Sequence, residues 1–499
     1  MRLGLITGQV YGNFIGGEWV QASSGKTYKT VNPARKSQVI GEFQSSDRSD
    51  VQRAIERAYA AWREWRSTPP PKRGEILLEA YYLMKKRAED FSRLIALEMG
   101  KPIGDARGEV KRALNVLEFI AGEGRRMLGE TIPSEIPNNV IMTFRKPLGV
   151  VSIITPWNFP IAIPVWKIAP ALVAGNAVVF KPAATTPLCG VKLMELFADA
   201  GIPAGVLNMV TGSGSLIGDE LVSNEKIAAV SFTGSTAVGR QIYAKAAHHL
   251  KKAQCEMGGK NAVVVLEDAN IDAAVSAIIQ GAFSSTGERC TATSRVIVEK
   301  PAREELMEKL IQRVSRLKVG DPLEEDTYVG PLAHEEQYIK VRDYIEIGKS
   351  EGAKLVYGGR TLTEPPYDDG YYVQPAVFAD AKPEMRIARE EIFGPVLTVL
   401  EARDMHEAAE INNSVYYGFK TSIYTENIRK AFRFADMCDT GMVHINAPTL
   451  GGEVQAPFGG LKESGAGYKE LGREAIRFYT NEIITYLDYS EQRPEVKFI

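Results

Sequence analysis

The sequence contains few of the residues that build metal sites, disulfide frameworks and histidine-dependent catalytic centres. Among 499 residues there are four cysteines and five histidines. The cysteines, Cys189, Cys255, Cys290 and Cys438, form no CxxC pair and have no histidine at a metal-ligand spacing, so no metal site is expected. Four scattered cysteines also make a poor disulfide framework, which favours a reducing, cytoplasmic compartment.

The chain also lacks an excess of charge of either sign. Its 60 basic and 62 acidic residues leave a formal net charge of −2, which argues against nucleic acid or an anionic membrane as the main partner. Residues 1–20 contain no compact apolar run followed by a small-residue cleavage site, so no signal peptide is expected. The composition is that of a globular protein, and the length allows two or three domains.

One segment, residues 147–166, carries no charged side chain, and at about 20 residues it would be long enough for a membrane span. Pro156, Pro160 and Pro164 recur within it at every fourth position. Proline inside a helix costs about 3 kcal/mol. We therefore expect a strand followed by a proline-rich turn.

Short apolar runs alternate with helical segments after an initial helical region at residues 49–124. Strands are expected at 149–154, 177–180, 206–210 and 228–232, and helices at 187–200 and 216–223. The alternation restarts after Glu256, with strands at 262–266 and 294–299 and helices at 271–283 and 303–317. This pattern predicts parallel sheets covered by helices, in two α/β domains that meet near 256–260.

Two segments, residues 135–144 and 482–489, alternate polar and apolar side chains as extended strands do. They could pair with other chains, because exposed strand edges accept further strands. Pairing with each other, or within the core, fits the pattern equally well.

Cys290 is the strongest candidate for a catalytic nucleophile. A thiol forms thioesters readily, and a carboxylate such as Glu256 can activate the water that cleaves them. No histidine lies near Cys290 in the sequence, which argues against a Cys–His hydrolase. The two residues predict covalent catalysis on a carbonyl, although a buried structural cysteine and a solvated glutamate are alternatives.

Further candidates lie after predicted strands. The segment from Phe232 to Gly239 opens a helix whose free N–H groups could bind a phosphate, although its Gly-x-x-x-x-Gly pattern is neither a P-loop nor G-x-G-x-x-G. Lys181 ends a strand, where ligands bind in open α/β sheets. Asn158 could donate to an oxyanion, and Glu391 could accept hydrogen bonds from a ribose. Taken singly, each also fits an ordinary turn or surface charge.

Taken together, the motifs resemble the NAD(P)-dependent aldehyde dehydrogenase superfamily, over residues 11–486. The resemblance rests on Pro156-Trp157-Asn158-Phe159-Pro160, Lys181-Pro182, Phe232-Thr233-Gly234-Ser235, Glu256-Met257-Gly258-Gly259-Lys260, Gly287-Glu288-Arg289-Cys290, residues 390–396 and Pro457-Phe458-Gly459-Gly460. The chain looks most like the hydrolytic semialdehyde or broad-substrate members.

The resemblance implies an α/β fold in three parts. These are a Rossmann-like cofactor domain (1–126 and 148–257), an α/β catalytic domain (258–465), and a small β arm and tail for oligomerisation (127–147 and 475–499). It also implies a homo-oligomer, a tetramer rather than a dimer.

The family mechanism implies roles for the catalytic residues. Cys290 would attack the aldehyde, while the Asn158 side chain and the Cys290 N–H hold the oxyanion. Glu256 would activate water, and Lys167 and Glu470 would form a second proton-handling pair. CoA-acylating relatives typically lack the carboxylate at position 256, so its presence predicts a free carboxylic acid as product. The implied cofactor-binding residues are Ile154, Thr155, Pro156, Trp157, Lys181, Ala183, Ala184, Gly214, Phe232, Thr233, Gly234, Ser235, Val238, Gly258, Glu391 and Phe393.

One departure from the family bears on the cofactor. NAD-preferring members commonly place Glu three residues after the position of Lys181, and here that residue is Ala184. Alanine does not repel a 2′-phosphate, and Lys181 could pair with one. NADP is therefore expected to be accepted or preferred, with NAD also possible.

The substrate side is suggested by Phe159, Ala162, Ile163, Trp166, Arg289, Thr291 and Phe458. An apolar passage of this kind suits a small aliphatic or aromatic aldehyde. The alternative is a carboxylate-bearing semialdehyde of the succinic or 2-oxoglutaric type, attracted by Arg289 unless that side chain lies in a salt bridge.

Two other classes of protein fit parts of the pattern. A catalytically inactive dehydrogenase with a structural role would tend to lose catalytic residues, whereas Asn158, Glu256 and Cys290 are all present. A thioester-forming hydrolase would have no use for a dinucleotide loop.

Overall fold

The helical region at the start of the chain forms four consecutive helices. The computed structural model describes residues 8–491, and in it these helices are α1 (Arg48–Trp65), α2 (Pro70–Lys86), α3 (Ala88–Met99) and α4 (Ile103–Glu123). Helix α1 begins with a capping box, in which the side chains of Asp47 and Asp50 accept each other's backbone N–H, so its first turn is satisfied locally. The strands among residues 9–44 were not predicted; they are β1 (Gln9–Tyr11), β2 (Asn13–Ile15), β3 (Glu18–Val20), β4 (Thr27–Asn32) and β5 (Arg35–Gln44).

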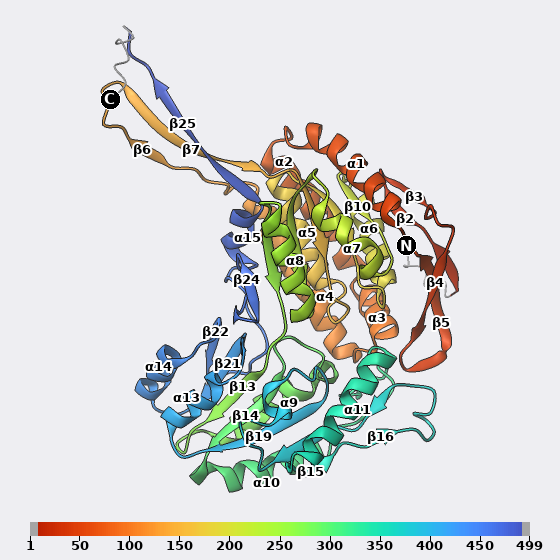
Figure 1. Cartoon of the computed structure of the whole chain (residues 1–499), viewed down its shortest axis with the longest axis vertical. Helices are drawn as coiled ribbons and strands as arrows, with labels where there is room; N and C mark the ends of the chain where they lie inside the picture. Colours follow the sequence, from red (N-terminus) through yellow and green to blue (C-terminus); the bar gives the residue numbers. More distant parts are fainter. Residues whose placement is uncertain (1–7, 492–499) are drawn as a thin grey trace.

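The first run of alternating strands and helices builds an eight-stranded sheet (Figure 1). Its order is β24-β12-β11-β8-β9-β10-β2-β3, and the five strands from β12 to β10 are parallel. Helices α2 to α6 pack on one face, and α1, α7 and α8 on the other. The elements not yet located are β8 (Val150–Ile154), β9 (Ala177–Lys181), β10 (Leu207–Met209), β11 (Ile227–Thr233), β12 (Lys252–Glu256), β24 (Gly465–Gly467), α5 (Ala162–Ala174), α6 (Pro187–Asp199), α7 (Gly214–Ser223) and α8 (Thr236–His248).

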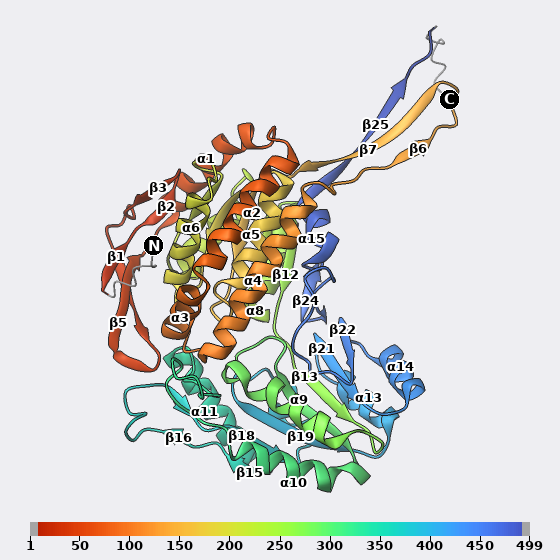
Figure 2. The same ribbon diagram turned by 180° about the vertical axis from the view of Figure 1, so that it is seen from behind.

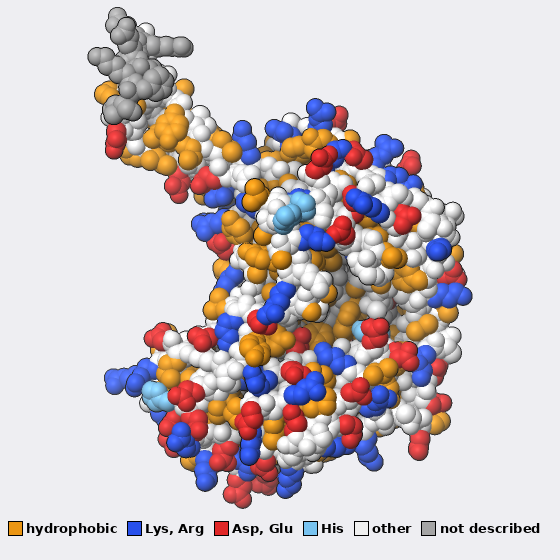
Figure 3. Space-filling model, in the orientation of Figure 1, with side chains coloured by type: hydrophobic (Ala, Val, Ile, Leu, Met, Phe, Trp, Pro, Cys, Tyr) orange, Lys and Arg blue, Asp and Glu red, His pale blue; other side chains and the backbone are white. Residues whose placement is uncertain are grey.

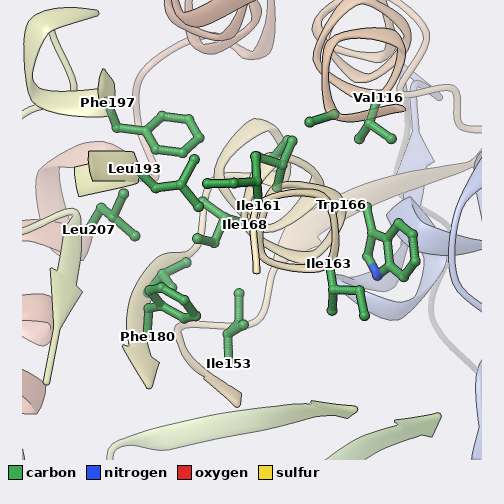
Figure 4. Close-up of a cluster of buried hydrophobic side chains, with 14 of the residues drawn as sticks. Val116, Ile153, Ile161, Ile163, Trp166, Ile168, Phe180, Leu193, Phe197 and Leu207 are labelled. Atoms are coloured by element: carbon green, nitrogen blue, oxygen red, sulfur yellow. The ribbon is translucent and has the colours of Figure 1, made fainter. Parts of the chain in front are cut away.

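The uncharged segment at residues 147–166 contains the expected strand, β8, but the proline-rich turn predicted after it was wrong for the last part of the segment. Residues 162–166 begin α5, in which Pro164 lies in the first turn and Pro170 in the interior. Proline is tolerated in a first turn, where the backbone N–H has no partner within the helix. Helix α5 is buried all round, and Figure 4 shows its Ile163, Trp166 and Ile168 among the core side chains, so burial outweighs the helix-breaking prolines. Among the described residues, no helix is long and apolar enough to cross a membrane.

The second run builds a seven-stranded sheet in the order β15-β18-β19-β14-β13-β21-β22, parallel except for β15. Helices α9 and α10 pack on one face, and α11, α13 and α14 on the other. The elements are β13 (Asn261–Val265), β14 (Thr293–Glu299), β15 (Lys354–Gly358), β18 (Ala376–Ala379), β19 (Val396–Ala402), β21 (Lys420–Tyr424), β22 (Met442–Ile445), α9 (Ile271–Phe283), α10 (Arg303–Val314), α11 (Glu335–Ser350), α13 (Met405–Asn413) and α14 (Ile428–Met437). The chain passes from the eight-stranded sheet to the seven-stranded sheet after Glu256. The surface is hollowed between the two parts of the molecule that contain these sheets (Figure 3).

The two extended segments pair with each other in an arm that projects from the body (Figures 1 and 2). Strand β25 (Thr480–Asp488), which follows α15 (Gly472–Phe478), runs antiparallel to β7 (Asn139–Pro147), and β7 also pairs with β6 (Thr131–Pro133). Phe144, Ile484 and Tyr486 are exposed on this arm. The last part of the expected tail, residues 492–499, lies outside the described residues.

Candidate active site

A cavity of about 730 Å³ lies at the carboxyl ends of β8, β9, β11 and β12 and reaches Cys290. Fourteen of the sixteen predicted cofactor residues line it, while Ala183 and Ala184 do not. Sequence reasoning missed the lining residues Ser215, Gly218, Asp219, Val222, Gln241, Ile242, Lys245, Met257, Gln337 and Lys340. Helical spacing from Gly214 and Val238 could have found those on α7 and α8, because residues three and four apart share a helix face.

The wall of the cavity offers unsatisfied polar groups to a ligand. At Ser213 and Ser235, which precede α7 and α8, no side chain caps the helix, so N–H groups of both first turns remain available for a phosphate. The hydroxyls of Thr155 and Thr233 are buried and have no hydrogen-bond partner among the described residues. These groups fit the polar backbone of a dinucleotide.

Lys181 brings a positive charge to the same wall. Its Nζ donates to the Pro182 carbonyl at 3.1 Å, and burial lowers its pKa to about 8. No carboxylate forms an ion pair with it in the described part of the chain.

Glu391 lies where the loop after β12 closes the cavity. Its Oε1 accepts the N–H of Gly259 at 2.8 Å, and a Cβ at Gly258 would lie 2.3 Å from its Oε2. Glycine at 258 is therefore needed for this approach. Phe393, at φ 62°, meets Trp157 edge-on with ring centres 5.4 Å apart.

Cys290 follows an unusual stretch of backbone. Ser285, Thr286 and Gly287 all have positive φ, between 49° and 70°, and a β-branched residue in this region costs about 1–3 kcal/mol. Asp105, on α4, accepts the N–H of Ser285 at 2.6 Å and holds the turn. Burial raises the pKa of the Cys290 thiol to about 12, with further contributions from nearby carboxylates.

Asn158 is held beside this loop. Its Nδ2 donates to the Glu288 carbonyl at 3.1 Å, and its own carbonyl accepts from Lys101 Nζ at 2.7 Å. Lys101 forms a fully buried ion pair with Glu109, whose Oε1 also accepts the backbone N–H groups of residues 161 and 162, at 2.8 and 3.1 Å. The sequence carries no signal for the roles of Lys101 and Glu109, which look like ordinary helix charges.

Glu256, Glu470 and Lys167 form one buried cluster. Glu256 does not line the cavity; its Oε2 accepts the Gly460 N–H at 3.2 Å. Glu470 pairs with Lys167, which also donates to Ser231 Oγ at 2.9 Å. Burial, together with the charge of Glu470, raises the pKa of Glu256 well above its usual range.

Aromatic rings gather on the predicted substrate side. The ring of Phe458 lies 5.5 Å from Trp166 and 5.4 Å from Phe419. Phe159 packs with them in the same core, together with Ile163 and Ala162, and Cys290 packs against that core. Thr291 is buried, and its carbonyl accepts from the Thr449 hydroxyl at 2.8 Å.

Arg289 forms a salt bridge, which was the expected alternative to binding a substrate carboxylate. Its Nη2 contacts Asp105 at 2.9 Å and Ser285 Oγ at 2.8 Å. Its guanidinium carbon lies 5.4 Å from the centre of the Phe159 ring. The charge of Arg289 is therefore already compensated.

The cavity lies at strand ends and leads to a cysteine with an amide donor beside it, an arrangement that fits a dinucleotide-dependent dehydrogenase. The chain belongs to the aldehyde dehydrogenase family, whose model matches residues 19–483. It is therefore an oxidoreductase acting on aldehydes, and the predicted family and α/β fold are confirmed.

The similar proteins include two relatives whose names specify a substrate. The chain is 46% identical to the alpha-ketoglutaric semialdehyde dehydrogenase of Bacillus subtilis (96% of this chain, 98% of the relative). It is 45% identical to the 2,5-dioxopentanoate dehydrogenase of Saccharolobus solfataricus (94% and 98%). The crystal structure of betaine aldehyde dehydrogenase from Staphylococcus aureus in complex with NAD+ matches with a TM-score of 0.94 at 32% identity, over 98% of this chain and 97% of that one.

Proposed function

We propose that this enzyme oxidises 2,5-dioxopentanoate, which is alpha-ketoglutaric semialdehyde, to 2-oxoglutarate. The observation that carries the proposal is that two relatives, each matched over nearly its whole length, are named for this same aldehyde. They favour the semialdehyde alternative over the small aliphatic or aromatic aldehyde that was the main expectation.

The first step uses the groups around Cys290. Its Sγ adds as a thiolate to the aldehyde carbon. Asn158 Nδ2 carries two hydrogens, of which one donates to Glu288, so the second is available to the oxyanion. The N–H of Cys290 is the other proposed donor. When bound in the cavity, the oxidised nicotinamide accepts the hydride from this carbon.

The second step releases the acid. Glu256 takes a proton from the water that attacks the Cys290 thioester. Its raised pKa makes it an effective base only where the pH is high enough to ionise it. Lys167 and Glu470, which contact each other in the same cluster, are the proposed route by which this proton leaves.

The cavity is proposed to accept both dinucleotides. A similar structure holds NAD+, which supports NAD. Position 184 offers no carboxylate to repel a 2′-phosphate, and the Lys181 charge has no ion-pair partner among the described residues, which supports NADP.

We further propose the division into three parts at the boundaries predicted above, and assembly of a homo-oligomer through the arm, in the cytoplasm. The exposed Phe144, Ile484 and Tyr486 support the arm as a contact surface. Sedimentation should show a tetramer, and a monomer at micromolar concentration would contradict this assignment.

The substrate is tested by the formation of reduced cofactor with 2,5-dioxopentanoate, succinic semialdehyde, pentanal and benzaldehyde, each with NAD+ and NADP+. We expect kcat/KM for 2,5-dioxopentanoate to exceed that for pentanal by about tenfold or more, the effect of one charge-assisted contact. If kcat/KM for the neutral aldehydes equals that for 2,5-dioxopentanoate, the proposed substrate is refuted. If no aldehyde is turned over, the proposed reaction is refuted.

A further inference from the structure

Two cationic side chains converge beside the aromatic rings of the substrate side. Arg112 lies on α4, and Lys420 begins β21. A Cβ added to Gly452 would lie 3.7 Å from Arg112 Nη2, 3.9 Å from Lys420 Nζ and 3.6 Å from a ring carbon of Phe458. The two charged groups therefore face one point at the edge of the Phe458 ring.

Neither cation is compensated by an anion. Lys420 is buried, its Nζ donates to the Gly451 carbonyl, and it lies 5.8 Å from the centre of the Phe458 ring. Arg112 has no hydrogen-bond or ion-pair partner among residues 8–491. Burial lowers the pKa of Lys420 to about 8, with the nearby Cys290 opposing this shift and the charge of Arg112 adding to it. Burial also lowers the pKa of Arg112. Lys420 is buried and Arg112 half-buried, and charges removed from water are normally paired, so two like charges without a carboxylate mark a place for an anion.

Lys420, one of the two cations, lies close to Cys290. The side chain of Asn261 joins the two, because its Oδ1 accepts the Lys420 N–H at 2.9 Å and its Nδ2 donates to the Cys290 carbonyl at 2.8 Å. Arg112 lies one turn before Val116 on the same face of α4, and Val116 packs in the core that contains Trp166 (Figure 4).

We infer that Arg112 and Lys420 bind the carboxylate of the semialdehyde and so direct its aldehyde end to Cys290. This inference rests on the proposed function and names the groups that would select its substrate. It assigns the task to these two residues rather than to Arg289, whose charge is already paired with Asp105. An incoming carboxylate would relieve the repulsion between the two cations and gain charge-assisted hydrogen bonds.

The test compares 2,5-dioxopentanoate with pentanal, a neutral aldehyde of the same chain length, in Arg112→Gln and Lys420→Met. The ratio of the two kcat/KM values should fall about tenfold or more in each variant, because each removes a hydrogen bond to a charged group. Arg112→Lys keeps the charge and should retain most of the ratio. Lys111→Gln, at an exposed neighbouring position on α4, is the matched control and should leave the ratio unchanged.

The outcomes separate the two proposals. If the wild-type enzyme does not prefer 2,5-dioxopentanoate, the proposed function fails and the inference fails with it. If the wild-type enzyme prefers this substrate and both variants keep the preference, only the assignment of Arg112 and Lys420 is overturned. If Lys420→Met does not fold, Arg112→Gln decides the matter alone, since its side chain is only half-buried.

Discussion

Replacing Lys101 with methionine should lower both the stability of this enzyme and its catalytic rate, and a second change at Glu109 should separate the two effects. Lys101 and Glu109 are both fully buried and form an ion pair. Lys101 also donates to the Asn158 carbonyl at 2.7 Å, so one side chain supports both the charge balance of α4 and the position of the proposed oxyanion donor.

The magnitude follows from the groups left behind. Removing one partner of a buried ion pair typically costs 3–5 kcal/mol. Glu109 would retain two backbone donors, the N–H groups of residues 161 and 162, so we expect a loss near the lower end, about 3 kcal/mol. Losing an oxyanion donor outright costs about 10²–10³ in rate. Because Asn158 would lose only an anchor, we expect kcat to fall about tenfold.

The second variant, Lys101→Met with Glu109→Gln, removes the stranded charge while keeping an amide oxygen for the same two N–H groups. It should recover more than half of the lost free energy of unfolding but not the lost kcat. Urea titration followed by tryptophan fluorescence measures the first quantity, and steady-state turnover at saturating aldehyde and cofactor measures the second.

The matched control is Lys72→Met. Lys72 forms an exposed ion pair with Glu75 at 2.9 Å, and exposed pairs contribute about 0–1 kcal/mol. A loss below about 1 kcal/mol with full kcat in Lys101→Met would refute the reasoning. So would a loss in Lys72→Met as large as that in Lys101→Met.

Four further predictions concern the cavity and the buried carboxylates. Glu256→Gln should give a first-turnover burst of reduced cofactor followed by slow steady-state turnover; undiminished turnover would exclude Glu256 as the base. Burial and the charge of Glu470 raise the pKa of Glu256, so the base form of Glu256 is lost as the pH falls through that raised value. Glu470→Gln should therefore shift the acidic limb of the turnover profile to lower pH. An acidic limb that stays in place or moves to higher pH would contradict this. Ala184→Glu should lower kcat/KM for NADP+ relative to NAD+ by about tenfold or more, whereas an unchanged ratio would mean that position 184 does not face the ribose. Gly258→Ala places a methyl group 2.3 Å from the Glu391 carboxylate and should raise the cofactor KM; an unchanged KM would show that Glu391 does not contact the cofactor.

Much of the architecture could be read from local pattern. The expected strands at 149–154, 177–180 and 228–232 correspond to β8, β9 and β11, and the helix predicted at 271–283 is α9 with the same bounds. The spacing of apolar residues and the positions of turn residues are local properties of the sequence, and these elements of the fold agree with them. The pattern failed at α5, where burial of every face outweighs the effect of two prolines. It also missed the N-terminal strands, which pair mainly with one another and of which β2 also pairs with the distant β10.

The sequence by itself determined the chemistry available to the site. A thiol at Cys290 and a carboxylate at Glu256 predict covalent catalysis on a carbonyl from residue type alone. The order of the motifs that include Asn158 and Glu391 carries the family resemblance, and that resemblance predicts aldehyde oxidation.

The tertiary structure alone decided which charges are compensated and which are free to bind a ligand. Arg289 stands next to Cys290 in sequence, yet α4 supplies its counter-ion, Asp105. Arg112 and Lys420 are about 300 residues apart, yet they meet beside Phe458 without an anion. The physical reason is that the pKa and the binding capacity of a charged group depend on the groups that surround it after folding, and those groups come from distant parts of the chain.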